Sequence, residues 1–137
     1  MIIDDIKKLF TDKKYDVEDL VEASFEVYWT SEDHDEGYYD ITVVEDCETP
    51  YVLISSDTIA RFNPRKKDKV LRLINDLNNE RYFCKFIIEE DSLIRCNFLT
   101  FLPKVKESYI DTFTYAFLLL LSGIKESFEE IGKVCLE

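Results

Sequence analysis

Residues 23–29 read Ala-Ser-Phe-Glu-Val-Tyr-Trp, and along them apolar side chains alternate with more polar ones. If this segment is extended, Phe25, Val27 and Trp29 share one direction, because successive side chains of a β-strand point to opposite faces. The intervening side chains are mostly polar and point the other way. Alternation of this kind is typical of a strand with one buried face.

Two further strands are expected directly after this one. Residues 38–45 alternate in the same way, and a short apolar segment follows at residues 51–55. The acidic segment 30–37, which ends in glycine, and the segment 46–50, which ends in proline, predict turns between the strands. Three short strands joined by short turns predict an antiparallel meander.

The second half of the chain begins with a helix and continues with a hairpin. Asn63 and Pro64 suit the cap and the first position of a helix. Alternating apolar residues then predict strands at 82–89 and 93–102, joined by a turn at residues 90–92. This half therefore adds a helix and two strands to the sheet.

Helices are predicted at both ends of the chain. Residues 4–14 carry apolar side chains at helical spacing, and residues 105–134 keep a longer apolar stripe. Leu118 and Leu119 fall off that stripe, so the middle of the last helix is apolar nearly all round. Either this helix is sandwiched inside the domain or it contacts a second chain.

Together these elements follow the order α-β-β-β-α-β-β-α. We expect one α+β domain over residues 1–137, with an antiparallel sheet of about five strands and helices collected on one face. A chain of 137 residues is of ordinary single-domain size.

Net charge and cysteine content limit the kinds of binding partner and the cellular compartment that we expect for this protein. The formal net charge of −12 disfavours binding to the phosphate backbone of nucleic acids and to anionic membranes. The N-terminal residues lack a positive segment followed by a long apolar stretch, so no secretory signal is expected. No two of the four cysteines have zinc-site spacing, which favours reduced thiols in a soluble, cytoplasmic protein.

Catalytic, cofactor and metal sites are not predicted. His34 is the only histidine, and it lies in the acidic turn at residues 32–36 with no nucleophile indicated nearby. Asp33 and Asp35 imitate only the start of a calcium-binding loop. A sensor of metals or small ligands that uses Asp33, His34 and Asp35 remains an alternative hypothesis.

The most informative feature is the second face of the predicted hairpin. An uncovered antiparallel sheet should be polar on its outer face, yet apolar side chains occupy both faces of these two strands. Either this face binds another protein chain, or a helix or the N-terminal segment covers it. Candidate contact residues from the hairpin and the last helix are Phe83, Ile87, Leu93, Leu99, Phe101, Leu118 and Leu119.

The helix and hairpin also carry a family resemblance. Residues 70–78 read Val-Leu-Arg-Leu-Ile-Asn-Asp-Leu-Asn and precede the hairpin. This segment, with its Leu77-Asn78 pair, resembles the YbjN family, which shares the fold of class I type III secretion chaperones. The resemblance implies a small, acidic, often dimeric and non-enzymatic protein, in a family described as bacterial sensory transduction regulators. It implies no catalytic residue.

These observations lead to one functional hypothesis and two alternatives. The hypothesis is a protein-binding regulator or chaperone-like module, a homodimer or a binder of a protein client, which uses apolar sheet and helix surfaces. The alternatives are a type III secretion-type chaperone for a specific effector, and the ligand or metal sensor that uses residues 32–36.

Overall fold

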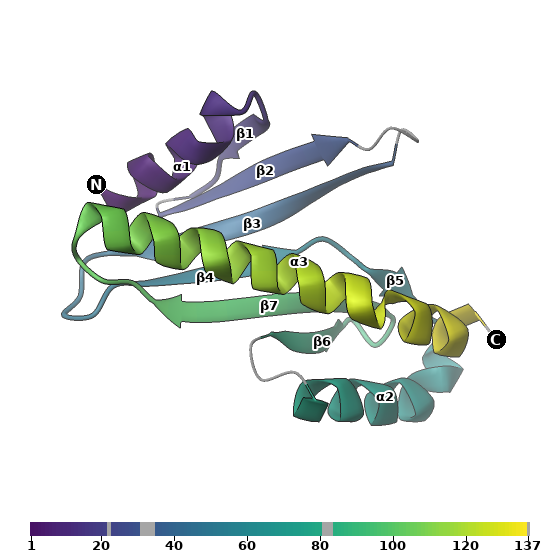
Figure 1. Ribbon diagram of the computed structural model, residues 1–137. Coiled ribbons are helices and arrows are strands. Elements are labelled where there is room, and N and C mark those ends of the chain that lie inside the picture. The colour runs from purple at the N-terminus through teal and green to yellow at the C-terminus, as the bar shows by residue number, and fades with distance from the viewer. Residues whose placement is uncertain (22, 31–34, 81–83, 137) are drawn as a thin grey trace.

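The computed structural model describes residues 1–21, 23–30, 35–80 and 84–136, and within them the chain forms one antiparallel sheet (Figure 1). The sheet has seven strands in the order β1-β2-β3-β4-β7, and both β5 and β6 also pair with β7. The strands are β1 Asp16–Asp19, β2 Ser24–Thr30, β3 Glu36–Val44, β4 Tyr51–Ser56, β5 Ala60–Arg61, β6 Lys85–Glu89 and β7 Leu93–Phe101. The predicted α+β class and antiparallel sheet are confirmed.

Two strands differ from the sequence-based expectation. Residues 16–19 lie between the predicted first helix and the predicted first strand, and Asp16–Asp19 pairs with β2 as strand β1. Three of its four side chains are charged, so the hydrophobic pattern gives no indication of a strand. Strand β5 contains only two residues, which is too short for any periodicity.

The three α-helices lie close to their predicted positions. They are α1 Ile2–Asp12, α2 Lys67–Glu80 and α3 Lys106–Leu136, and a 3-10 turn at Pro64–Lys66 precedes α2. The side chain of Asn63 accepts a hydrogen bond of 3.0 Å from the backbone N–H of Arg65, as the capping pattern predicts. Helix α3 runs diagonally across one face of the sheet, and α2 lies beside β6 (Figure 1).

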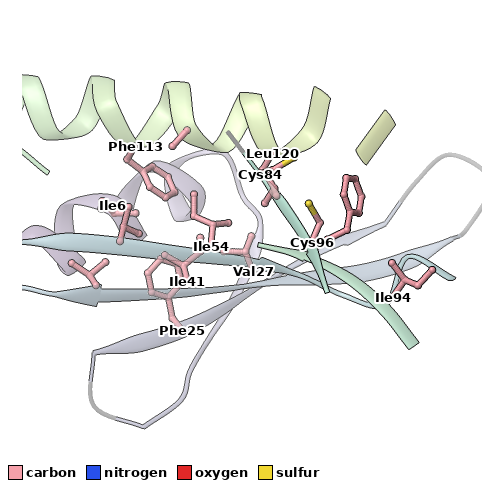
Figure 2. Packing of buried hydrophobic residues seen from close by; sticks show 14 of the residues in the cluster. Ile6, Phe25, Val27, Ile41, Ile54, Cys84, Ile94, Cys96, Phe113 and Leu120 are labelled. Atoms are coloured by element: carbon pink, nitrogen blue, oxygen red, sulfur yellow. The ribbon is translucent and has the colours of Figure 1, made fainter. Parts of the chain in front are cut away.

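Most of the hydrophobic core fills the layer between the sheet and helices α1 and α3 (Figure 2), and α2 adds Val70, Ile74 and Leu77. The ring of Phe10 in α1 meets the ring of Phe113 in α3 edge to face at 5.9 Å, and it meets Phe25 of β2 at 6.2 Å. Tyr109 near the start of α3 donates a hydrogen bond to the carboxylate of Asp5 in α1. That hydrogen bond lowers the pKa of Asp5. The two helices are thus joined to each other and to the sheet.

The hairpin cysteines belong to this core. Cys84 and Cys96 are buried. The pKa of the Cys96 thiol is raised by its hydrogen bond with Cys84 and by burial. Protonated buried thiols behave as small apolar groups, so these cysteines serve packing.

Four basic residues lie at positions 65, 66, 67 and 69, and two of them make structural contacts. Lys66 Nζ donates a hydrogen bond of 3.3 Å to the carbonyl oxygen of Cys135 near the end of α3. A cation at this position complements the partial negative charge of a helix C-terminus. Lys67 pairs with Asp91 at 2.6 Å, which ties the start of α2 to the β6–β7 turn.

Candidate functional site

The face of the sheet turned away from α1 and α3, called here the outer face, carries a group of apolar side chains that no described helix covers. Leu99 and Phe101 of β7 are 54% and 63% exposed. In the adjacent strand β4, Leu53 lies opposite Leu99 and Tyr51 lies opposite Phe101. Val44 of β3 lies opposite Tyr51 in turn. We call these five residues the outer-face patch.

The other hairpin residues proposed from the sequence are less accessible. Ile87 and Leu93 are half-buried on the outer face. Ile87 lies opposite Arg95, and Leu93 lies opposite Glu89. Phe83 lies outside the described residues. The exposed apolar area is therefore centred on the C-terminal half of β7.

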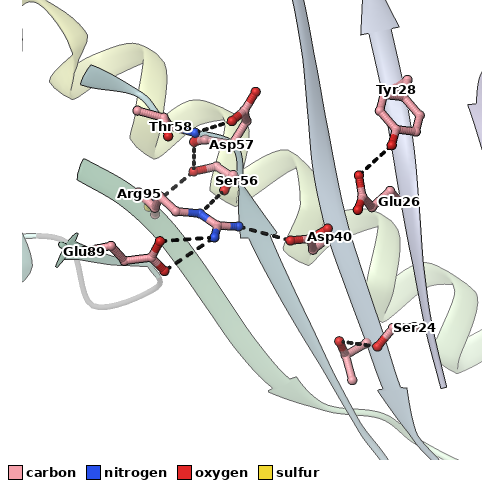
Figure 3. A network of polar contacts seen from close by, with 11 residues as sticks. Ser24, Glu26, Tyr28, Asp40, Ser56, Asp57, Thr58, Glu89 and Arg95 are labelled. Carbon is pink, nitrogen blue, oxygen red and sulfur yellow. Dashed lines mark hydrogen bonds and ion pairs between the residues drawn. The ribbon is translucent and has the colours of Figure 1, made fainter. Parts of the chain in front are cut away.

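A polar network occupies the neighbouring part of the outer face, around Arg95 (Figure 3). Arg95 Nε donates to the carbonyl oxygen of Ser56 at 2.7 Å, and its Nη2 donates to Asp40 Oδ2 at 3.1 Å. Its Nη1 lies 3.4 Å from both carboxylate oxygens of Glu89. Arg95, itself in β7, thereby links that strand to β3, β4 and β6. The polar network lies next to the outer-face patch.

The electrostatics of this network are those of a partly desolvated ion pair. Burial raises the pKa of Asp40, and the hydrogen bond from Arg95 opposes that shift. Asp40 Oδ1 and Asn97 Oδ1 are inaccessible to solvent and have no hydrogen-bond partner among the described residues. Nearby, Tyr28 donates to Glu26 Oε2 at 2.7 Å, and this hydrogen bond raises the pKa of the tyrosine. Arg95, Asp40 and Glu89 thus join strands, whereas the bond between Tyr28 and Glu26 lies within β2.

The acidic turn proposed as an alternative metal or ligand site is only partly described. Asp33 and His34 lie outside the described residues, and Asp35 is exposed. Within the described ranges, no three histidine, cysteine, aspartate or glutamate side chains are grouped as metal ligands would be.

The two proposed helix residues lie on the opposite side of the sheet from the outer-face patch. Leu118 of α3 is 54% exposed, and the neighbouring Leu119 is half-buried. Leu118 lines a groove of about 380 Å³ between α3, the end of α1 and strands β2 and β3. The six candidate residues that the structure describes therefore do not form one surface, because sheet and helix candidates face in opposite directions.

The outer-face patch and the groove beside α3 contain several residues that the sequence analysis did not identify. Tyr51 and Leu53 alternate with the buried Val52 and Ile54. The period-two pattern of the sequence therefore indicates that Tyr51 and Leu53 point away from the core. Their place beside β7 depends on strand pairing, which the pattern of one strand does not specify. The groove combines residues from four elements, and no local pattern in the sequence indicates it.

Gly37 has a role that differs from the predicted turn. It lies inside β3, directly opposite Trp29 of β2. The indole ring of Trp29 packs so closely over Gly37 that a Cβ there would lie 2.4 Å from Trp29 Cζ2. The backbone of Gly37 has no positive φ, so close approach of the ring is the reason for glycine at this position.

Gly37→Ala is therefore expected to displace the indole ring and to destabilise the chain by about 1–3 kcal/mol, since overpacking forces side chains out of position. Chemical denaturation and the emission maximum of Trp29, the single tryptophan, would measure both effects. Gly132→Ala is the control, because nothing lies within 4 Å of a Cβ at that helical position. It should be neutral or stabilising, and an equal loss in both variants would refute the packing role of Gly37.

These features define a class of small α+β protein in which helices pack on one face of an antiparallel sheet and an apolar patch remains on the other face. The chain belongs to the YbjN family. The family model described as "Putative bacterial sensory transduction regulator" matches residues 3–130. This confirms the resemblance inferred from residues 70–78 and the hairpin.

A solved structure shares this fold. It is described as "Crystal structure of YbjN, a putative transcription regulator from E. coli", and the match has a TM-score of 0.55 over 95% of each chain at 9% sequence identity. At this identity the likeness concerns the fold alone. No curated protein matches the chain. None of the helices in the described ranges has the apolar length that crossing a bilayer requires.

Proposed function

We propose that this YbjN-family chain is a non-enzymatic protein-binding module, a single unit over residues 1–137, which acts by binding another protein chain through the outer-face patch. The observation that carries the proposal is the exposure of Leu99 and Phe101 beside Tyr51 and Leu53. An antiparallel sheet that faces only water is normally polar on that side. Large apolar groups gathered there gain free energy when a partner removes them from water.

The partner we propose first is a second copy of the same chain. The outer-face patch contains no charged residue, so two copies can meet there without burying like charges. The rest of each chain is strongly acidic, with a net charge of −12 per copy. Two such chains repel at long range, so apolar burial must supply the affinity and added salt should strengthen the association.

The net charge of −12 also favours a function that depends on contacts with proteins over one that depends on contacts with nucleic acid. Nucleic acid binding depends on cations that neutralise phosphates, and this chain carries 17 basic against 29 acidic residues. A basic or neutral protein client is compatible with the negative electrostatic potential of the chain. Such a client would compete with a second copy for the outer-face patch. The four cysteines are thiols in the structure, in keeping with action in the cytoplasm.

Leu99→Asp is expected to convert a dimer into a monomer, since an aspartate inside an apolar interface costs about 3 kcal/mol, or roughly 100-fold in affinity. Sedimentation equilibrium would show twice the 16.2 kDa chain mass for the unmodified protein and the single mass for the variant. Leu118→Asp is the matched control, because Leu118 is equally exposed but lies on the other side of the sheet. A mass that is unchanged by Leu99→Asp would contradict the proposal.

A further inference from the structure

The groove beside α3 is separate from the outer-face patch and differs from it in shape and charge. Its lining is predominantly apolar: Val27, Trp29 and Tyr39 come from the sheet, and Phe117 and Leu121 come from α3. Its volume of about 380 Å³ lies within the range of roughly 300–1,000 Å³ typical of small-ligand sites. We propose that this groove binds a small amphiphile, a free carboxylate with a linear apolar tail such as a medium-chain fatty acid.

The fold explains why this groove is open. Helix α1 ends at Asp12 and covers the neighbouring part of the sheet, where Phe10 packs against Phe113. Beyond the end of α1, no described helix covers the space between α3 and strands β2 and β3. Tyr39 and Phe117 meet edge to face at 5.1 Å and form the floor where sheet and helix approach each other.

Charge identifies where in the groove the carboxylate would lie. Among the described residues that line the groove, Lys13 at the C-terminal cap of α1 is the only charged one. Within the described part of the chain, the cations in ion pairs are Lys7, Lys67, Arg95, Lys106 and Lys133, so Lys13 has no such partner there. In a chain of net charge −12, this cation at the rim of an apolar groove favours a single anionic head group.

A second cavity disfavours a head group on its own side of the groove. It adjoins the groove at Trp29 and Tyr39, and its lining includes Asp35, Glu36 and Asp57. These carboxylates repel an anion, so the head group favours Lys13. The tail then lies against the apolar lining, which includes Leu118, Leu121 and Trp29.

The groove suits a slender apolar ligand. Its volume of about 380 Å³ is that of a small-ligand site, and a linear chain of methylene groups matches its apolar lining.

Trp29 makes the test direct, because it is the only tryptophan and it lines the groove. Titration of the whole chain with dodecanoate below its micelle concentration should produce a saturable blue shift of the emission with one site per chain. Leu118→Asp should remove the saturable change, and Leu99→Asp, on the outer face, should leave it intact. This control separates the groove from the proposed dimer surface.

The head-group assignment has its own pair of measurements. Lys13→Gln should weaken dodecanoate binding about tenfold and leave dodecanol binding unchanged, because only the carboxylate interacts with the ammonium group. Equal affinity of the variant and the unmodified chain for dodecanoate would overturn the assignment. So would a response of Trp29 to acidic amphipathic peptides or to anionic vesicles without a response to dodecanoate.

Discussion

Phe113→Ala is expected to lower the free energy of unfolding by about 3–5 kcal/mol, the usual cost of removing a buried phenyl ring. Phe113 is 1% exposed and packs edge to face on Phe10 at 5.9 Å and nearly parallel to Phe117 at 6.0 Å. The cavity left by the ring would lie where α1, α3 and the sheet meet, and those contacts would all be lost. Aromatic pairing adds to the loss beyond simple burial.

Urea unfolding followed by circular dichroism would measure this effect, and the midpoint of thermal unfolding should fall by about 10–20 °C. Leu118→Ala is the comparison on the same helix, because this side chain is 54% exposed. It should cost well under half as much. A Phe113→Ala protein that loses less than about 1 kcal/mol would show that α1 and α3 do not pack through this ring.

Asn78→Leu is the second substitution with a large expected effect, at about 2–4 kcal/mol. Asn78 Nδ2 donates to the carbonyl oxygen of Phe86 at 3.0 Å, and the backbone N–H of Phe86 donates to Asn78 Oδ1 at 2.7 Å. One carboxamide thus pairs with both backbone groups of Phe86 in β6. Leucine has a similar size and can satisfy neither, and each unpaired buried group costs about 1–3 kcal/mol.

Asn78→Asp is the control for Asn78→Leu, and its folding stability should depend on pH. The carboxylate still accepts from the N–H of Phe86 but repels its carbonyl oxygen, which raises the pKa of the new aspartate in the folded state. Stability is therefore lost as the pH rises through that pKa, and the variant should be closest to the unmodified chain near pH 4. Equal stability of Asn78→Leu and the unmodified chain would show that β6 does not depend on this carboxamide.

The regular elements were predictable because each carries its own periodic pattern. Alternation along residues 23–29 specified β2, and the apolar stripe at steps of three and four residues specified α3. Strand β1 could not be predicted, because hydrogen bonds to β2 hold it and three of its four side chains are charged. Gly37 was assigned to a turn for a similar reason, since its role depends on a ring from the neighbouring strand.

The candidate site was predictable in part. Alternation along β7 placed Leu99 and Phe101 on the outer face, where the structure shows them exposed. Their neighbours Tyr51 and Leu53 became part of the outer-face patch only through the pairing of β4 with β7. The Leu77-Asn78 pair indicated the family, but the contact of Asn78 with Phe86 requires α2 to lie along β6.

Binding of a second copy of the chain through the outer-face patch is tested most directly by the change in NMR chemical shifts on dilution of the isotope-labelled chain. We expect concentration-dependent shifts for Leu53, Leu99 and Phe101, with those of Leu118 constant. Shifts that are independent of concentration at the outer-face patch, or that change only around Leu118, would contradict this mode of binding.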